Sequence, residues 1–79
     1  MRFTVYSKHG CPYCEKIKQV LELANLQHQV YYLDEDYTRY EFYNAFGDGS
    51  TFPQVMLNDQ EKIGGCTDTI KYLQENSIV

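Results

Sequence analysis

The pattern of apolar and polar residues predicts that the first half of the chain is a strand, a helix and a second strand. Residues 2–7 alternate Phe and Val with Thr and Tyr, as in a strand with one buried face. Residues 12–25 place apolar side chains at intervals of three and four, which gives a helix one apolar face. Residues 29–34 have an uninterrupted apolar centre, typical of a strand covered on both faces. The helix is long enough to join the two strands as a parallel pair.

The second half of the chain predicts a helix, a strand hairpin and a final helix. Three acidic residues supply carboxylates that can cap a helix over residues 37–46. Strands over residues 54–58 and 61–63 are joined by a tight Asn-Asp-Gln turn and should pair antiparallel. The last helix is expected to run from Thr67, a good N-cap residue, to about Glu75.

This order of elements defines a fold class. It predicts an α/β domain in which a four-stranded mixed sheet is flanked by three helices, with helices on both faces. The arrangement is the thioredoxin-like fold in its shortest form. A chain of 79 residues has room for one such core, so residues 1–79 are expected to form a single domain.

Composition and charge exclude several classes of function. With 43% hydrophobic and 15% aromatic residues, the chain is expected to be globular and to fold without a metal. A net charge of −4 disfavours a general nucleic-acid or anionic-membrane surface. No apolar run is long enough to span a membrane, and the first residues lack the pattern of a signal peptide. We therefore expect a cytoplasmic protein, in which cysteines serve chemistry and not a disulfide framework.

The first chemical motif is Cys11-Pro12-Tyr13-Cys14, at the predicted junction of strand and helix. Proline suits the first position of a helix, which places Cys11 at or beside the N-cap. There the free backbone N–H groups and the helix dipole favour the thiolate and lower the thiol pKa. We interpret Cys11 as an activated nucleophile at an exposed tip, and Cys14 as its inward-facing partner. A structural zinc site usually needs two such pairs, and the chain has no second one.

Two further motifs lie far from the cysteines in the sequence. Thr51-Phe52-Pro53 precedes a strand, where a cis bond would turn the Phe52 backbone toward the thiols and leave it free to pair with an extended peptide. Gly64-Gly65-Cys66-Thr67-Asp68 combines two glycines with a helix N-terminus, which is suited to a carboxylate. Asp68 would then accept a hydrogen bond from an ammonium group. The same residues are also compatible with a strand-start proline and a capped helix without any ligand.

Taken together, the three motifs resemble those of glutaredoxins, over essentially the whole chain. The matching elements are the Cys-Pro-Tyr-Cys motif, the Thr-x-Pro element and the Gly-Gly-x-x-Asp element. The resemblance implies a glutathione-dependent thiol–disulfide oxidoreductase that reduces protein disulfides and glutathione mixed disulfides. Cys11 would be its nucleophile and Cys14 its resolving thiol, with glutathione as co-substrate and no metal.

The resemblance also implies a binding site for glutathione. In the family the proline of the Thr-x-Pro element is cis, and the residue before it pairs its backbone with the cysteinyl unit of glutathione. The γ-glutamyl carboxylate would lie at Thr67 and Asp68, and basic residues would face the glycine carboxylate. Cys66 is interpreted as a small, partly buried apolar residue. The predicted binding set is Lys8, Tyr13, Arg39, Thr51, Phe52, Pro53, Gly65, Cys66, Thr67 and Asp68.

Three other interpretations share parts of this pattern. A glutaredoxin-like thioredoxin would be reduced by thioredoxin reductase, an iron–sulfur carrier would share a cluster between two chains through Cys11 and glutathione, and a metal-binding module would bind zinc. The expected partners are glutathione and disulfide-bearing or glutathionylated proteins, with ribonucleotide reductase among the candidates. Neither nucleic acid nor a membrane is expected as a partner, and we expect a monomer.

Overall fold

The computed structural model describes residues 1–78 and has the element order that the pattern predicts. The four strands are β1 (Phe3–Ser7), β2 (His28–Tyr32), β3 (Gln54–Leu57) and β4 (Glu61–Gly64). The three helices are α1 (Pro12–Leu23), α2 (Arg39–Phe46) and α3 (Cys66–Glu75). Among residues 1–78 no helix is both long and apolar enough to cross a membrane.

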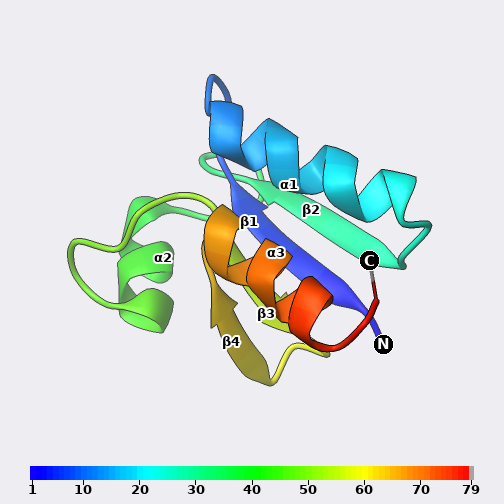
Figure 1. Cartoon of the computed structure of the whole chain (residues 1–79). Coiled ribbons are helices and arrows are strands. Elements are labelled where there is room, and N and C mark those ends of the chain that lie inside the picture. The colour runs from blue at the N-terminus through cyan, green and yellow to red at the C-terminus, as the bar shows by residue number, and fades with distance from the viewer. Residues whose placement is uncertain (79) are drawn as a thin grey trace.

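The four strands form one mixed sheet in the order β2-β1-β3-β4 (Figure 1). β1 and β2 are parallel, as expected for strands joined by a crossover helix. β1 and β3 are antiparallel, and β3 forms an antiparallel hairpin with β4. Asn58 and Asp59 in the hairpin turn both have positive φ, which Asn and Asp adopt more readily than other non-glycine residues. The predicted four-stranded mixed sheet of a thioredoxin-like fold is confirmed.

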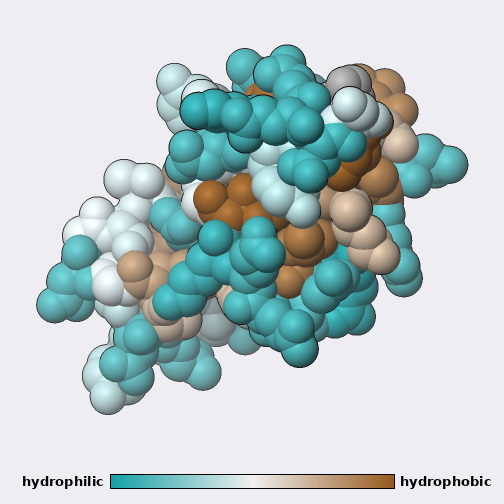
Figure 2. Space-filling model, turned by 60° about the horizontal axis from the view of Figure 1, so that its bottom comes forward, coloured by the Kyte–Doolittle hydropathy of each residue, from teal (hydrophilic) through white to brown (hydrophobic). Residues whose placement is uncertain are grey.

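The larger core lies between the sheet and helices α1 and α3, which cover the same face (Figure 1). Phe3 and Val5 point to this face from β1, and Ile17, Leu21 and Leu73 are completely buried against them. Hydrophobic residues at the border of this core are only partly buried. Figure 2 accordingly shows apolar side chains reaching the surface in a band between hydrophilic ones.

A second, smaller core joins α2 to the opposite face of the sheet. Because side chains alternate along a strand, Tyr6 points away from the larger core. Its ring contacts Tyr37 and Phe46 on the α2 side. Phe42 of α2 is buried at the centre of this cluster. Helices therefore lie on both faces of the sheet, as predicted.

The second strand is less buried than its pattern predicts. β2 is an edge strand, and its residues alternate between half-buried and exposed. Tyr31, in the middle of the apolar run, is 36% exposed. A tyrosine ring packs on a strand while its hydroxyl reaches water, so a run that contains tyrosines does not require cover on both faces. The prediction of a doubly covered strand was wrong for this reason.

The start of α2 also differs from the prediction. The helix begins after Thr38, whose Oγ1 accepts a hydrogen bond from the Glu41 N–H at 3.1 Å. The Glu41 carboxylate in turn accepts one from the Thr38 N–H at 2.9 Å, which completes a capping box. The acidic residues before it do not cap the helix. Asp36 instead accepts a hydrogen bond from the Tyr32 N–H within the preceding loop.

The N-cap of α3 is Gly65 and not Thr67. The helix begins at Cys66, and the Asp68 carboxylate accepts a hydrogen bond from the Gly65 N–H at 3.4 Å. This contact supplies the carboxylate half of a capping box without a capping hydroxyl. The prediction that Thr67 caps the last helix was therefore wrong, and Thr67 lies inside the first turn.

Candidate functional site

Cys11 and Cys14 form a disulfide at the start of α1. Cys11 is the N-cap residue, and its Sγ accepts a hydrogen bond from the Cys14 N–H at 3.2 Å. Pro12 occupies the first turn of the helix, where its missing N–H costs no hydrogen bond. The predicted N-cap position of Cys11 is confirmed. This hydrogen bond and the helix dipole stabilise negative charge on Sγ when the disulfide is reduced.

Both cysteines of the disulfide are buried, with Cys11 7% exposed and Cys14 3% exposed. The burial of Cys14 is as predicted, but the expectation that Cys11 forms an exposed tip was wrong for this oxidised state. Its Sγ lies 4.0 Å from the Phe52 carbonyl oxygen, so the loop before β3 covers one side of it. Tyr13, between the two cysteines, is 62% exposed. A partner sulfur therefore has to approach Cys11 between Tyr13 and the Phe52 loop.

A groove of about 250 Å³ lies between Tyr13 and the Phe52 loop, and most of the predicted binding residues line it. The Phe52–Pro53 peptide bond on its wall is cis, as the family resemblance implied. Three segments that are distant in the sequence meet in the groove, from the start of α1, the loop before β3 and the start of α3. Its lining residues are Tyr13, Thr51, Phe52, Pro53, Gly65, Cys66, Thr67 and Asp68.

The two remaining predicted binding residues, Lys8 and Arg39, do not line the groove. They share a neighbouring hollow of about 520 Å³ between the loop before α1 and the loop before α2. The Lys8 ammonium stands 5.1 Å above the centre of the Phe52 ring, so it lies beside the groove wall. Arg39 is exposed on α2, where a side-chain movement would be needed to reach a ligand in the groove.

Among residues 1–78, Cys66 is the one cysteine outside a disulfide, and it is buried at 5% exposure in the groove wall. Burial raises the pKa of this thiol, and the Lys16 ammonium offsets only part of that increase. Burial and the raised pKa both disfavour the reactive thiolate, which agrees with the interpretation of Cys66 as a small apolar residue. Within residues 1–78, no three His, Cys, Asp or Glu side chains are grouped as metal ligands.

Three contacts, made by His9 and by Phe42, support the site and have no signal in the sequence. His9, in the loop before the cysteines, lies 2.9 Å from the Glu35 carboxylate and stacks on Tyr32 with ring centroids 4.5 Å apart. Phe42 of α2 stacks on Phe52 with ring centroids 4.1 Å apart. These contacts join residues from different segments, and they hold the active-site loop and the groove wall against the β2–α2 region.

The sequence matches the glutaredoxin family model over residues 3–62. Glutaredoxin 1 of Escherichia coli (strain K12) is 34% identical over an alignment of 83 positions that covers 96% of each chain. The glutaredoxin of Vibrio cholerae is 31% identical over an alignment of 83 positions that covers 96% of this chain and 94% of the relative.

Solved structures show the same relationship. Reduced Escherichia coli glutaredoxin superposes with a TM-score of 0.82 at 28% identity, with all of both chains covered. Glutaredoxin 1 from Francisella tularensis, solved with cacodylate, superposes with a TM-score of 0.77 at 30% identity, covering 98% of this chain and 95% of that one. A buckwheat glutaredoxin–glutathione complex has the same fold, with a TM-score of 0.79 at 22% identity, covering 96% and 71% of the two chains. With a Cys-x-x-Cys disulfide at the start of α1, a thioredoxin-like fold and this family match, the chain belongs to the glutaredoxin family of thiol–disulfide oxidoreductases.

Proposed function

We propose that the protein is a glutathione-dependent thiol–disulfide oxidoreductase that reduces glutathione mixed disulfides and protein disulfides. The observation that carries the proposal is the groove beside the disulfide, which combines a cis-proline segment with the N-terminus of α3. A dithiol at a helix start is common to many redox proteins. The groove adds a place for a short peptide that carries its own thiol, and glutathione is such a peptide.

The groove offers a backbone partner for the cysteinyl unit of glutathione. Phe52 precedes β3 and lies outside the strand ladder, so its N–H and C=O are in a position to pair with an extended tripeptide. Its carbonyl oxygen lies 4.0 Å from Cys11 Sγ. A cysteinyl unit paired with Phe52 would therefore hold its sulfur close to the nucleophile.

The two ends of glutathione carry carboxylates, and each has a candidate site. The γ-glutamyl carboxylate fits the N-terminus of α3, where Thr67 is exposed and backbone N–H groups favour an anion. Asp68, also exposed, would accept a hydrogen bond from the α-ammonium group beside that carboxylate. Lys8, beside the groove wall, would face the glycine carboxylate, and Arg39 would reach it from the neighbouring hollow after a side-chain movement.

A glutathione mixed disulfide requires only Cys11. The Cys11 thiolate attacks the glutathione sulfur, a Cys11–glutathione disulfide forms, and the substrate sulfur leaves as a thiolate that takes up a proton. The thiolate of a second glutathione then attacks the glutathione sulfur on Cys11. This step releases glutathione disulfide and regenerates the Cys11 thiolate.

A protein disulfide requires both cysteines. Cys11 attacks one substrate sulfur and forms a mixed disulfide, and Cys14 then attacks Cys11 Sγ and releases the reduced substrate. The product is the Cys11–Cys14 disulfide of this structure, which two glutathione molecules reduce in turn. Glutathione reductase and NADPH would return the electrons, and the cytoplasm, where thiols are kept reduced, is the compartment that we propose.

Cysteine variants test the assignment of roles. In an assay coupled to NADPH and glutathione reductase, Cys11→Ser should abolish reduction of both substrate types. Cys14→Ser should keep most of the activity on a glutathione mixed disulfide and lose the reduction of a protein disulfide. Full activity of the Cys11→Ser protein would overturn the proposal.

A change of reductase separates the two possible electron donors. With glutathione omitted and thioredoxin reductase supplied in place of glutathione reductase, NADPH oxidation by the wild-type protein should be slow. Faster turnover with thioredoxin reductase than with glutathione would assign the protein as a glutaredoxin-like thioredoxin instead.

A further inference from the structure

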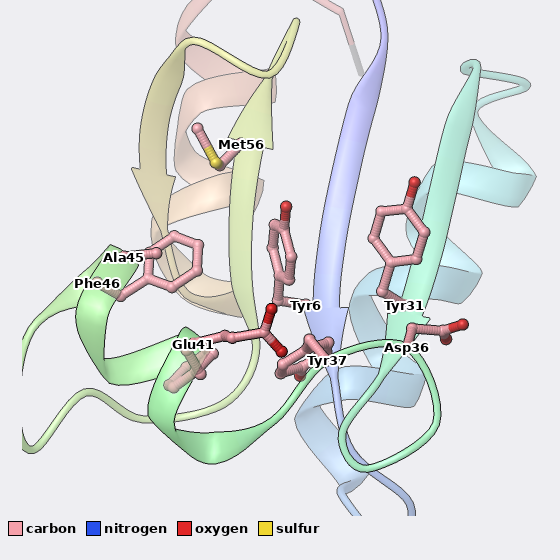
Figure 3. A pocket seen from close by; sticks show the side chains of 9 residues that line it. Tyr6, Tyr31, Asp36, Tyr37, Glu41, Ala45, Phe46 and Met56 are labelled. Atoms are coloured by element: carbon pink, nitrogen blue, oxygen red, sulfur yellow. The ribbon is translucent and has the colours of Figure 1, made fainter.

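A second cavity, of about 290 Å³, lies on the face of the sheet that α2 covers. It shares no lining residue with the groove beside the disulfide, so the proposed function does not use it. Figure 3 shows this space between α2 and the strands, with tyrosines of β1 and β2 standing side by side above it. We call it the aromatic cavity, and its volume is at the small end of ligand sites in proteins.

Aromatic rings from three parts of the chain surround the aromatic cavity. The Tyr6 ring centroid lies 5.7 Å from that of Tyr31, 5.4 Å from that of Tyr37 and 5.2 Å from that of Phe46. Their planes are tilted by 42° to 76° relative to Tyr6, so ring faces and edges of different orientation border one space. The face of an aromatic ring carries partial negative charge and attracts a cation.

The charged residues that line the aromatic cavity are both acidic. Asp36 Oδ2 accepts a hydrogen bond from the Tyr32 N–H, and Glu41 Oε1 accepts one from the Thr38 N–H. Each carboxylate is thus positioned by one oxygen and keeps a second oxygen for another partner. In Figure 3 the Glu41 carboxylate points toward Tyr6 and Tyr37. Within residues 1–78, no lysine or arginine lines this cavity.

The pKa values of two tyrosines that line the aromatic cavity reflect burial and nearby charge. Burial raises the pKa of Tyr37 first, Tyr6 and Asp36 raise it further, and the nearby Arg39 guanidinium offsets part of the increase. Burial also raises the pKa of Tyr6, with additional contributions from Asp59 and Tyr31. Negative charge is therefore disfavoured in this cavity.

The rim of the cavity already accepts an ammonium group. Lys62 of β4 donates a hydrogen bond to the Ala45 carbonyl oxygen, and its Nζ stands 5.6 Å above the Phe46 ring. Ala45 and Phe46 both line the cavity. We propose that the aromatic cavity binds a small aliphatic ammonium ion, with its charge against the ring faces and the Asp36 and Glu41 carboxylates, and its chain in the apolar interior.

Titration of the full chain with n-butylammonium chloride, at constant ionic strength, tests this proposal. The backbone amide NMR signals of Tyr6, Tyr31 and Ala45 should shift together and saturate. The neutral analogue 1-butanol should bind about fivefold more weakly or worse, because it lacks the cation–π attraction of about 1 kcal/mol or more. Nα-acetyl-lysine N-methylamide, used as a third probe, distinguishes a free amine from a lysine side chain of a protein as the source of the ammonium group.

Conservative variants assign the binding to the cavity. Glu41→Gln and Asp36→Asn remove a charge but keep a carbonyl oxygen to accept the backbone hydrogen bond. Each should weaken butylammonium binding by about two- to fivefold, the usual effect of one partly exposed charge. Glu22→Gln is the matched control, because Glu22 is exposed on α1 and does not line the cavity. It loses the same charge and should leave the affinity unchanged.

Three results would overturn the proposal. Absence of saturable shifts with both ammonium probes would show that the cavity takes no ammonium ion. Equal affinity for butanol and butylammonium would show that it is only an apolar hollow. Equal weakening of binding by Glu22→Gln and the two cavity variants would show that the affinity depends only on the net charge of the protein. None of these results would bear on the proposed reduction of disulfides, which depends on the other groove.

Discussion

Gly64 is the residue whose replacement should disturb the groove beside the disulfide most sharply. Its φ is +123°, a conformation that side chains rarely adopt. A Cβ at this position would lie 2.5 Å from Asp68 Oδ2 and 3.0 Å from Asp68 Cβ. We expect Gly64→Ala to lower the free energy of unfolding by about 1–3 kcal/mol and to turn the Asp68 side chain away. Urea unfolding measures the first effect, and an increased KM for glutathione measures the second.

Gly65→Ala is the matched control for this prediction. Gly65 has a φ of −84°, and a Cβ there would lie 3.5 Å from the Pro53 carbonyl oxygen, an ordinary contact. We expect it to lose less than about 1 kcal/mol, the scale of N-cap differences between small residues. Equal losses for the two glycine variants would contradict the argument from backbone conformation.

Residue roles that depend on chain neighbours could be predicted from the sequence. Pro12 marks the start of α1, so the N-cap position of Cys11 follows from adjacent residues. Thr67 shows the limit of this reasoning. Threonine is at least as good an N-cap as glycine in isolation, but the Asp68 carboxylate already satisfies the Gly65 N–H. The helix therefore begins earlier than the threonine signal indicates.

Among the helices, α2 depends most on its cap. It has 8 residues, too few to be stable as an isolated helix, and the hydrogen bonds between Thr38 and Glu41 satisfy two of its first N–H groups. We expect Thr38→Ala to lower the free energy of unfolding by about 1 kcal/mol, measured by urea unfolding. Thr67→Ala is the control and should cost less, because Gly65 caps α3. A larger loss for Thr67→Ala would return the N-cap role to Thr67.

The order and type of all seven elements could be predicted because the apolar periods that define them are local. The place of each strand in the sheet could not. β2 lies at the edge in the order β2-β1-β3-β4, yet its tyrosine-rich run has the same pattern as a central strand. Its position depends on β3 occupying the other side of β1, and that pairing joins segments about fifty residues apart.

At the scale of the whole molecule, family motifs predicted which segments meet at the groove but not what supports them. Eight of the ten predicted binding residues line one groove. Phe42, which stacks on Phe52 from α2, carries no motif, and neither does Glu35, the partner of His9. Such contacts depend on how α2 packs against the sheet, so only the folded chain reveals them.

Tyr37 makes another long-range contact, and its ionisation makes the stability of the protein depend on pH. It is 8% exposed, and its hydroxyl donates a hydrogen bond to the Ser7 carbonyl oxygen at the end of β1. Burial, with Tyr6 and Asp36, raises its pKa above the ordinary value of 10.0. The unfolded chain therefore loses this proton at lower pH than the folded protein does. The stability that Tyr37 contributes is complete below pH 10 and falls as the pH rises above that value.

Tyr37→Phe should remove this dependence on pH. Near neutral pH we expect a loss of about 1 kcal/mol for the missing hydrogen bond, because the Ser7 carbonyl keeps a second hydrogen bond from the Leu33 N–H at 2.9 Å. Above about pH 10, the unfolding free energy of the variant should decline less steeply than that of the parent. Urea unfolding over a pH series measures both effects. Both proteins carry Cys66→Ala, because the raised pKa of the buried Cys66 thiol would also make stability fall as the pH rises. Tyr40→Phe, at a residue that is 77% exposed, is the control and should leave the slope unchanged. An unchanged slope in Tyr37→Phe would show that Tyr37 ionises as freely in the folded protein as in the unfolded chain, and an equal change in both variants would show that the effect is not specific to Tyr37.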